Sequence, residues 1–96
     1  MRAIAVFMQT IHDEESLADY RAKVIHTLEA FGGKFLARGG HFTVIEGTMP
    51  HGRIVMVEFP SRARAEAWYT SEAYQAILPM RLKSMDCDAF IIDALD

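Results

Sequence analysis

Two apolar runs constrain this chain more than any other feature of its sequence. Ala3–Met8 and Ile54–Val57 carry apolar side chains at both alternating sets of positions. Successive side chains of a β-strand point to opposite faces of the sheet, so these runs predict strands that are buried on both faces. Helices from one short chain can cover one face, and the second face then needs another cover.

Helical periodicity and turn residues predict a helix and two further strands in the N-terminal half of the chain. A helix is expected over residues 14–31, with Asp13 as its N-cap and Gly32-Gly33 at its end. Its inner stripe is Leu17, Tyr20, Val24, Leu28 and Phe31. Strands are expected over 34–38 and 42–46. Gly39-Gly40 between them is either a turn or a kink in one long strand, and we favour the kink because the 47–52 loop supplies a better hairpin turn.

The second half predicts a strand over 53–59, two helical pieces and a last strand over 86–93. Ser61 and Ser71 are expected to cap the helical pieces, and Pro79 is expected to break or kink the second one. The inner stripe of that piece is Tyr74, Ile77, Leu78, Leu82 and Met85. The order β-α-β-β-α-β predicts one α+β domain over residues 1–96, ferredoxin-like, with a four-stranded antiparallel sheet and helices on one face.

The uncovered sheet face predicts a homodimer. In this topology the first and third strands are central, and both are apolar on the side that the helices leave open. An apolar patch across four strands exceeds what soluble monomers usually expose. Two identical sheet faces packed about a two-fold axis would cover it, which gives a dimeric α/β barrel.

Composition excludes several classes of function. The net charge is −3 and there is no basic stripe, so we expect no nucleic-acid binding. The apolar N-terminal run is too short to cross a membrane and no cleavage site follows it, so we expect no membrane insertion. Cys87 is the only cysteine, which excludes an intramolecular disulfide and favours a cytoplasmic protein.

Four ordered motifs resemble one known family. They are Gly32-Gly33-Lys34-Phe35-Leu36-Ala37-Arg38-Gly39-Gly40, Ile45-Glu46-Gly47, Val57-Glu58-Phe59-Pro60-Ser61 and Trp68-Tyr69-Thr70-Ser71-Glu72-Ala73-Tyr74-Gln75. Together they resemble the domain of unknown function 1330 family along essentially the whole chain. The resemblance implies the dimeric α/β-barrel fold of the ferredoxin-like group and no settled reaction. Relatives of that fold include cofactor-independent monooxygenases, lactone isomerases and dehalogenase-type enzymes, an analogy of fold alone.

Arg81 and Glu58 are the strongest candidates for chemistry. Arg81 falls within an apolar helical stripe, where a guanidinium needs a carboxylate, a ligand anion or a route to water. The alternative is a side chain that extends along the helix end to solvent. Glu58 ends an apolar strand and is a candidate general acid or base, unless it forms an ion pair with Arg81 or Arg38 or faces water at the strand end.

Weaker candidates surround the two glycines and the helix break. Arg38 is a candidate anion-binding residue and His41 a candidate proton-transfer residue, against the alternative of a plain polar bend. Tyr69 and Tyr74 are candidate ligand-binding residues, and Trp68 is expected in the core.

No set of His, Asp, Glu and Cys has metal-site spacing, so we expect neither a metal nor a cofactor. Three hypotheses remain open. The chain is a cofactor-independent enzyme that moves a proton on a small organic acid, enol or aromatic compound. It is a non-catalytic ligand-binding or stress-associated module that uses the same pocket between sheet and helices. Or it is a purely structural dimer.

Overall fold

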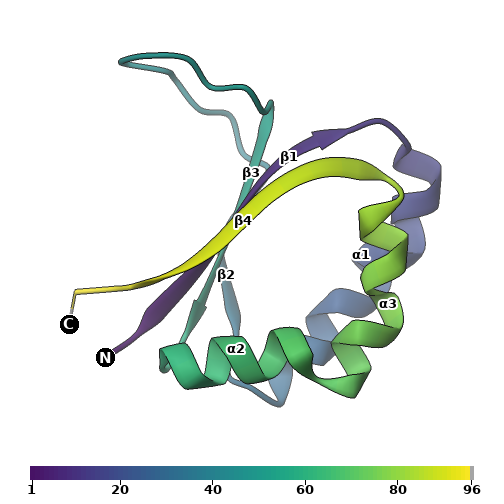
Figure 1. The fold of residues 1–96 in the computed structure, drawn as a ribbon, viewed down its shortest axis with the longest axis vertical. Helices are drawn as coiled ribbons and strands as arrows, with labels where there is room; N and C mark the ends of the chain where they lie inside the picture. The colour runs from purple at the N-terminus through teal and green to yellow at the C-terminus, as the bar shows by residue number, and fades with distance from the viewer. Residues whose placement is uncertain (96) are drawn as a thin grey trace.

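The computed structural model describes residues 1–95 and forms one sheet with three helices (Figure 1). The elements in chain order are β1 (Ala3–Ile11), α1 (Glu14–Glu29), β2 (Lys34–Arg38), β3 (Arg53–Phe59), α2 (Arg62–Thr70), α3 (Glu72–Leu82) and β4 (Met85–Asp93). This order is the expected β-α-β-β-α-β pattern, with the last helical region divided into two helices.

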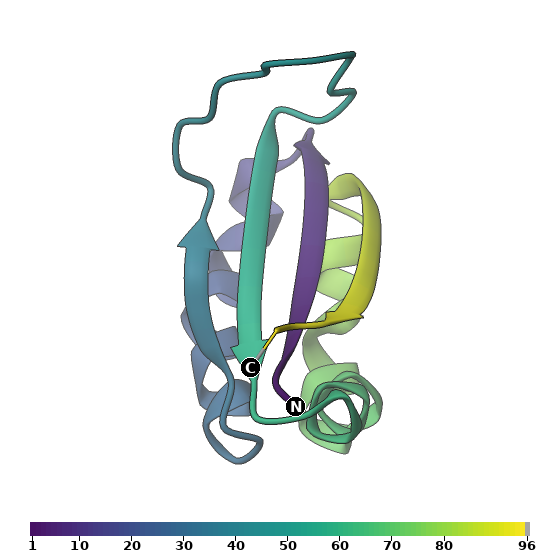
Figure 2. The same cartoon turned by 90° about the vertical axis from the view of Figure 1, so that its left-hand side faces the viewer.

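The sheet is antiparallel with the strand order β2-β3-β1-β4, so the two doubly apolar strands are central as expected. Val6 of β1 lies opposite Met56 of β3 and Phe90 of β4. In Figure 2, α1 and α3 lie behind the sheet, α2 is seen end-on beside its lower end, and the face toward the viewer has no helix on it. The chain therefore covers one face of its own sheet and leaves the other open.

Local capping explains where the helices begin. The Asp13 carboxylate accepts a hydrogen bond from the Ser16 backbone N–H at 3.0 Å, as an N-cap does at the start of α1. The Ser71 hydroxyl accepts from the Tyr74 backbone N–H and donates to the Trp68 carbonyl. Ser71 thus ends α2 and starts α3, and the chain turns there without a loop.

The core lies between the inner sheet face and the helices. Trp68 is 1% exposed and packs against the rings of Phe59 and Tyr74, with centroids 5.4 and 4.1 Å away. Its indole N–H donates to the Thr27 hydroxyl at 3.0 Å, so burial leaves no donor unsatisfied. Trp68 is a core residue, as expected.

The open face is apolar in its centre. Leu36, Phe90 and Ile92 are 52%, 48% and 52% exposed and lie on β2 and β4. Ile4, Val6 and Met8 of β1 alternate with the buried inner-face residues, and Ile54 and Met56 of β3 lie opposite Met8 and Val6. The outward-facing positions of the two central strands are therefore apolar, as the sequence predicted.

One expected strand does not form. Residues 42–46 belong to an extended arm, residues 40–52, that joins β2 to β3 and projects beyond the sheet (Figures 1 and 2). Gly39-Gly40 is not a kink in one long strand, because β2 ends at Arg38 and Gly39 has a φ of 72°. The positive φ turns the chain away from the sheet, so residues 42–46 have no neighbouring strand to pair with.

Pro79 was expected to break or kink α3, and a break is wrong because the helix continues through it to Leu82. The expected inner stripe is also too long, because Leu82 is 58% exposed and Met85 begins β4. Pro79 and Gln75 are both exposed, so water can replace the backbone donor that the proline lacks.

Candidate functional site

A cavity lies between the inner sheet face and α1. It encloses about 450 Å³ of space, part of it continuous with solvent, and about 40 Å³ of this admits the centre of a water molecule, room for roughly three waters. Its apolar walls are Phe7, Leu17, Val24, Leu28, Phe35, Val55, Val57, Trp68 and Met85, and its polar groups are Gln9, Tyr20, Arg21, Arg38 and Arg53. This is a narrow apolar cavity with a strongly basic set of polar groups.

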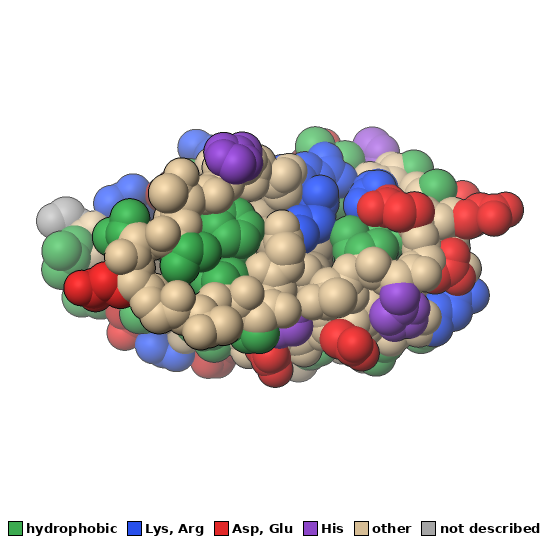
Figure 3. Space-filling model, turned by 90° about the horizontal axis from the view of Figure 1, so that it is seen from above, with side chains coloured by type: hydrophobic (Ala, Val, Ile, Leu, Met, Phe, Trp, Pro, Cys, Tyr) green, Lys and Arg blue, Asp and Glu red, His purple; other side chains and the backbone are tan. Residues whose placement is uncertain are grey.

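The basic groups come from three different elements. Arg21 lies on α1, Arg38 ends β2 and Arg53 begins β3. Figure 3 shows Lys and Arg side chains gathering in the middle of the face seen from above, beside hydrophobic side chains. The Arg38 guanidinium stacks on the Phe35 ring at 4.3 Å and donates to the Arg21 carbonyl at 3.3 Å. These contacts hold Arg38 at the cavity without neutralising it.

The charge at this arginine group is only partly balanced. In the described part of the chain, Glu14 is the only acid that forms an ion pair with it, at 2.7 Å from Arg21. Arg53 donates instead to the neutral Gln9 side chain at 3.2 Å. Burial, and then the neighbouring Arg21 and Arg38 charges, lower the pKa of Arg53. An anion placed here would relieve that repulsion.

Gly39 is required by this arrangement. Its φ of 72° disfavours any other residue, and a Cβ at this position would lie 2.0 Å from Nη1 of Arg53. Gly39 therefore makes room for the Arg53 side chain. Its backbone N–H donates to the Ile54 carbonyl at 2.9 Å, so that amide is not open to a ligand.

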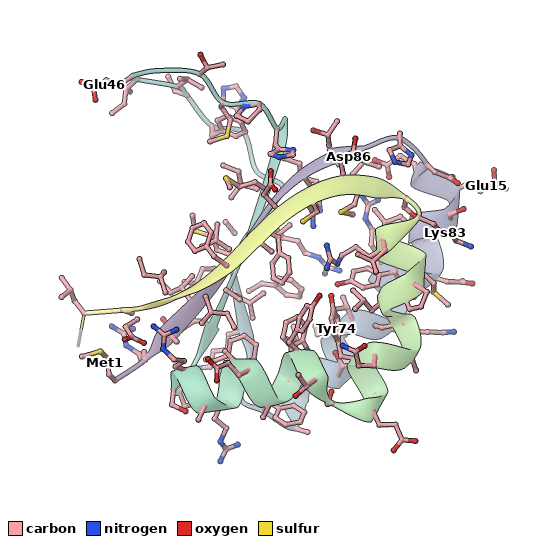
Figure 4. All side chains as sticks on the ribbon, in the orientation of Figure 1. Met1, Glu15, Glu46, Tyr74, Lys83 and Asp86 are labelled. Carbon is pink, nitrogen blue, oxygen red and sulfur yellow. The ribbon has the colours of Figure 1, made fainter. Side chains whose placement is uncertain are left out.

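A hydrogen-bonded chain of three side chains extends from the cavity into the core. The hydroxyls of Tyr20 and Tyr74 are 2.8 Å apart, and Nε of Arg81 donates to the Tyr74 hydroxyl at 3.2 Å. Arg81 is 3% exposed and its guanidinium lies 5.2 Å from the centre of the Phe7 ring. In Figure 4, Tyr74 extends from α3 into the space between the helices and the sheet. We call this chain the tyrosine relay.

The interior charge of the relay has no acidic partner. Among the residues that the structure describes, no Asp or Glu forms an ion pair with Arg81. Burial raises the pKa of Tyr20 and of Tyr74 above the ordinary value of a phenol, so neither supplies a negative charge near neutral pH. Arg81 is thus a buried cation whose neighbours include the Phe7 ring, the Tyr74 hydroxyl and the Cys87 thiol, and no carboxylate among the described residues.

A second hydrogen-bonded chain lies on the open sheet face and was missed by the sequence analysis. Nδ1 of His51 is 2.8 Å from the Thr10 hydroxyl, and Nε2 is 2.8 Å from the Asp88 carboxylate. His51 is 9% exposed although it belongs to the arm. Its signal in the sequence was weak, because the three side chains come from β1, the arm and β4 and meet only in the folded structure.

The six predicted site residues separate into groups. Arg38 reaches the cavity, Tyr74 and Arg81 belong to the tyrosine relay, and Tyr69 lines a second, apolar depression beside β4 that is partly open to solvent. Glu58 lies opposite Ile4 on the other side of the sheet, and its carboxylate bonds to Arg2 at 3.0 Å rather than to Arg81 or Arg38. His41 is exposed in the arm. Glu58 and His41, the two proton-transfer candidates, therefore do not line the cavity that holds Arg21, Arg38 and Arg53.

Residues 1–95 contain no group of three or more His, Cys, Asp or Glu side chains that could hold a metal ion. In the same range, no helix is both long and apolar enough to span a bilayer.

The fold and the cavity define a ferredoxin-like α+β protein with an arginine-lined pocket between its sheet and its helices. The family model described as "Domain of unknown function (DUF1330)" matches residues 2–95. The chain belongs to this family, as its four motifs suggested. No curated protein matches the chain.

Several solved structures share the fold. A protein of unknown function from Rhodopseudomonas palustris has a TM-score of 0.80 at 16% identity, over 99% of this chain and 83% of the other. SnoaB, a cofactor-independent oxygenase from Streptomyces nogalater, has a TM-score of 0.70 at 8% identity, over 99% and 94%. A dimeric ferredoxin-like protein of unknown function from Jannaschia sp. CCS1 has a TM-score of 0.69 at 11% identity, over 98% and 100%. At these identities the likeness shows the fold alone.

Proposed function

We propose that this chain binds a small organic anion with an apolar body in the cavity under α1. The observation that carries the proposal is the arginine group at an apolar cavity. Arg21, Arg38 and Arg53 come together with one paired acid, and the walls behind them are aliphatic and aromatic. A few convergent polar groups at an apolar cavity are typical of ligand sites, and guanidinium groups match carboxylates by paired hydrogen bonds.

Binding explains the site better than turnover does. Glu58 is on the opposite sheet face and His41 is exposed in the arm, so neither lines the cavity. SnoaB shows that this fold supports cofactor-independent oxygenation in another protein, at 8% identity. The proposal therefore concerns recognition of an organic acid, enol or aromatic anion, and it assigns no reaction.

We further propose that the chain is a cytoplasmic homodimer that pairs through the open sheet face. Its central strands place Ile4, Val6 and Met56 on that face, and Leu36 and Ile92 are half exposed there. Structures of proteins from Jannaschia sp. CCS1 and Thermobifida fusca with this fold are described as dimeric. A second copy would cover the face with an identical apolar surface.

Benzoate and its neutral analogue benzamide test the binding proposal, because they have the same shape and differ in charge. Isothermal titration and thermal shift would be measured on the wild type, Arg38→Gln and Arg53→Gln. Arg64→Gln is the matched control, since Arg64 is an exposed arginine on α2 and does not line the cavity.

The wild type should bind benzoate more tightly than benzamide. Each cavity variant should weaken benzoate binding about tenfold, because one hydrogen bond to a charged group contributes about 1.5–3 kcal/mol. Arg64→Gln should bind benzoate like the wild type. Equal binding of benzoate and benzamide, or an equal loss in all three variants, would contradict the proposal.

A further inference from the structure

We propose that the Tyr20 hydroxyl is an oxyanion-binding donor inside the cavity, and that Tyr74 and Arg81 are the residues that position and polarise it. The inference rests on the proposed function and narrows its ligand class. The anion would carry a phenol, enol or carbonyl oxygen that reaches Tyr20, as hydroxyaromatic acids and 2-oxo acids do.

Burial decides the direction of the hydrogen bonds in the tyrosine relay. Arg81 can only donate, so the Tyr74 hydroxyl accepts from Nε of Arg81. Tyr74 is 0% exposed, and among the described residues the only other partner of its hydroxyl is Tyr20. A buried hydroxyl proton without an acceptor costs about 1–3 kcal/mol. Tyr74 must therefore donate to Tyr20.

The last proton of the relay then belongs to Tyr20. Its oxygen accepts from Tyr74, so its own O–H is the hydroxyl proton of the relay for which the described residues provide no acceptor. Tyr20 is partly exposed and lines the cavity, whereas Tyr74 and Arg81 do not. The relay thus ends in a hydroxyl proton that a molecule in the cavity can accept.

The buried cation strengthens that donor. Successive hydrogen bonds polarise one another, and the relay begins at a guanidinium that no carboxylate neutralises in the described part of the chain. Burial also raises the pKa of Tyr20, so the hydroxyl keeps its proton and remains a donor. Pre-oriented donors in an apolar site stabilise a developing oxyanion more than water does.

This arrangement assigns different parts of a ligand to different groups. The arginine group would hold the carboxylate near solvent, and Tyr20 would hold the second oxygen among apolar side chains that include Leu17 and Val24. The ionised form of that oxygen should bind more tightly than the neutral form. A phenol or enol should therefore lose its proton more readily in the cavity than in water.

The test uses 4-nitrophenol, whose phenolate and phenol forms have different visible spectra, and 4-nitroanisole, which has a similar shape but cannot ionise. The preference for phenolate over phenol would be measured by titrating the bound dye with pH in the wild type, Tyr20→Phe, Tyr74→Phe and Arg53→Gln. Binding of 4-nitroanisole reports whether each variant keeps its cavity.

The wild type should favour phenolate. Tyr20→Phe should lower that preference about tenfold, and Tyr74→Phe about threefold, because Tyr20 then keeps its hydroxyl and loses its polarisation. Binding of 4-nitroanisole should not change in either variant. An unchanged preference in Tyr20→Phe would overturn this inference and leave the binding proposal standing. Arg53→Gln should leave the preference unchanged, because the arginine group is assigned to a carboxylate that these dyes lack. A preference that falls in Arg53→Gln and not in Tyr20→Phe would overturn this inference as well. No saturable binding of either dye would overturn both.

Discussion

The two faces of the sheet each carry a series of hydrogen-bonded side chains, and the two series differ in whether the charged group is buried. The inner face holds the tyrosine relay, which begins at Arg81 with no acid beside it, and the open face holds Thr10, His51 and Asp88, where a carboxylate ends the chain. On the open face the charged group is 75% exposed, while on the inner face it is 3% exposed. A buried cation without an acidic partner is costly, and the proposed role of Arg81 in polarising Tyr20 gives a reason for that cost, which the exposed Asp88 carboxylate does not incur.

The largest expected effect concerns the open face. Ile92→Glu should convert the proposed dimer to a monomer, because two-fold symmetry places a carboxylate in the apolar interface twice, and we expect association to weaken at least ~100-fold. Light scattering after size exclusion measures this. Ile25→Glu is the matched control, since Ile25 is an exposed isoleucine on α1, away from that face. A dimer that survives Ile92→Glu would show that this face is not the interface.

The next largest effect is a decrease in the free energy of unfolding at high pH, caused by the buried phenols of Tyr20 and Tyr74. Burial raises the pKa values of Tyr20 and Tyr74 in the folded state. Their contribution is complete below the unfolded phenol pKa of about 10 and is lost as the pH rises toward the folded-state values, by up to about 1.4 kcal/mol per unit and per phenol. Urea unfolding of Tyr20→Phe between neutral pH and high pH should show a shallower slope than the wild type. Equal slopes would mean that Tyr20 is not buried as a phenol.

Arg81→Met should separate stability from ligand recognition. Methionine fills a similar volume without a charge, so the variant should be stabilised by about 1 kcal/mol, which raises Tm by roughly 4–8 °C for a domain of this size. Its preference for phenolate should fall. A large drop in Tm would identify Arg81 as a structural partner and would remove the argument that the cation is kept for function.

The smallest expected effect concerns the hydrogen bonds of His51 to Thr10 and Asp88 on the open face. His51→Leu removes the hydrogen bonds to Thr10 and Asp88 and should cost about 1 kcal/mol or less. Hydrogen exchange should increase first in the arm over residues 40–52 and not in β1. Faster exchange throughout β1 would show that His51 supports the sheet rather than the arm.

The fold was predictable because its determinants are local or periodic. The doubly apolar runs identified the central strands, and Asp13, Ser61 and Ser71 marked the helix starts that the structure shows. Residues 42–46 have the composition of a strand, but pairing depends on a neighbour, and the turn at Gly39 removes it. Pro79 tolerates its place in α3 because that side of the helix is exposed, which periodicity alone overlooked.

The site was predictable only in part. Arg81 was found because a cation in an apolar stripe is conspicuous, and Arg38 because it adjoins the glycines. Tyr20 belongs to the inner stripe of α1 and looked like a core residue, since its link to Arg81 passes through Tyr74, 54 residues away in the sequence. Arg53 and Gly39 likewise become informative only when β2 and β3 lie side by side.

A crystal structure with benzoate at a concentration that saturates binding in solution tests the central claim most directly. We predict benzoate in the cavity under α1, with its carboxylate within hydrogen-bonding distance of Arg38 or Arg53 and its ring against the apolar walls. Ordered benzoate elsewhere with this cavity empty would contradict the claim that the arginine group is a ligand-binding site.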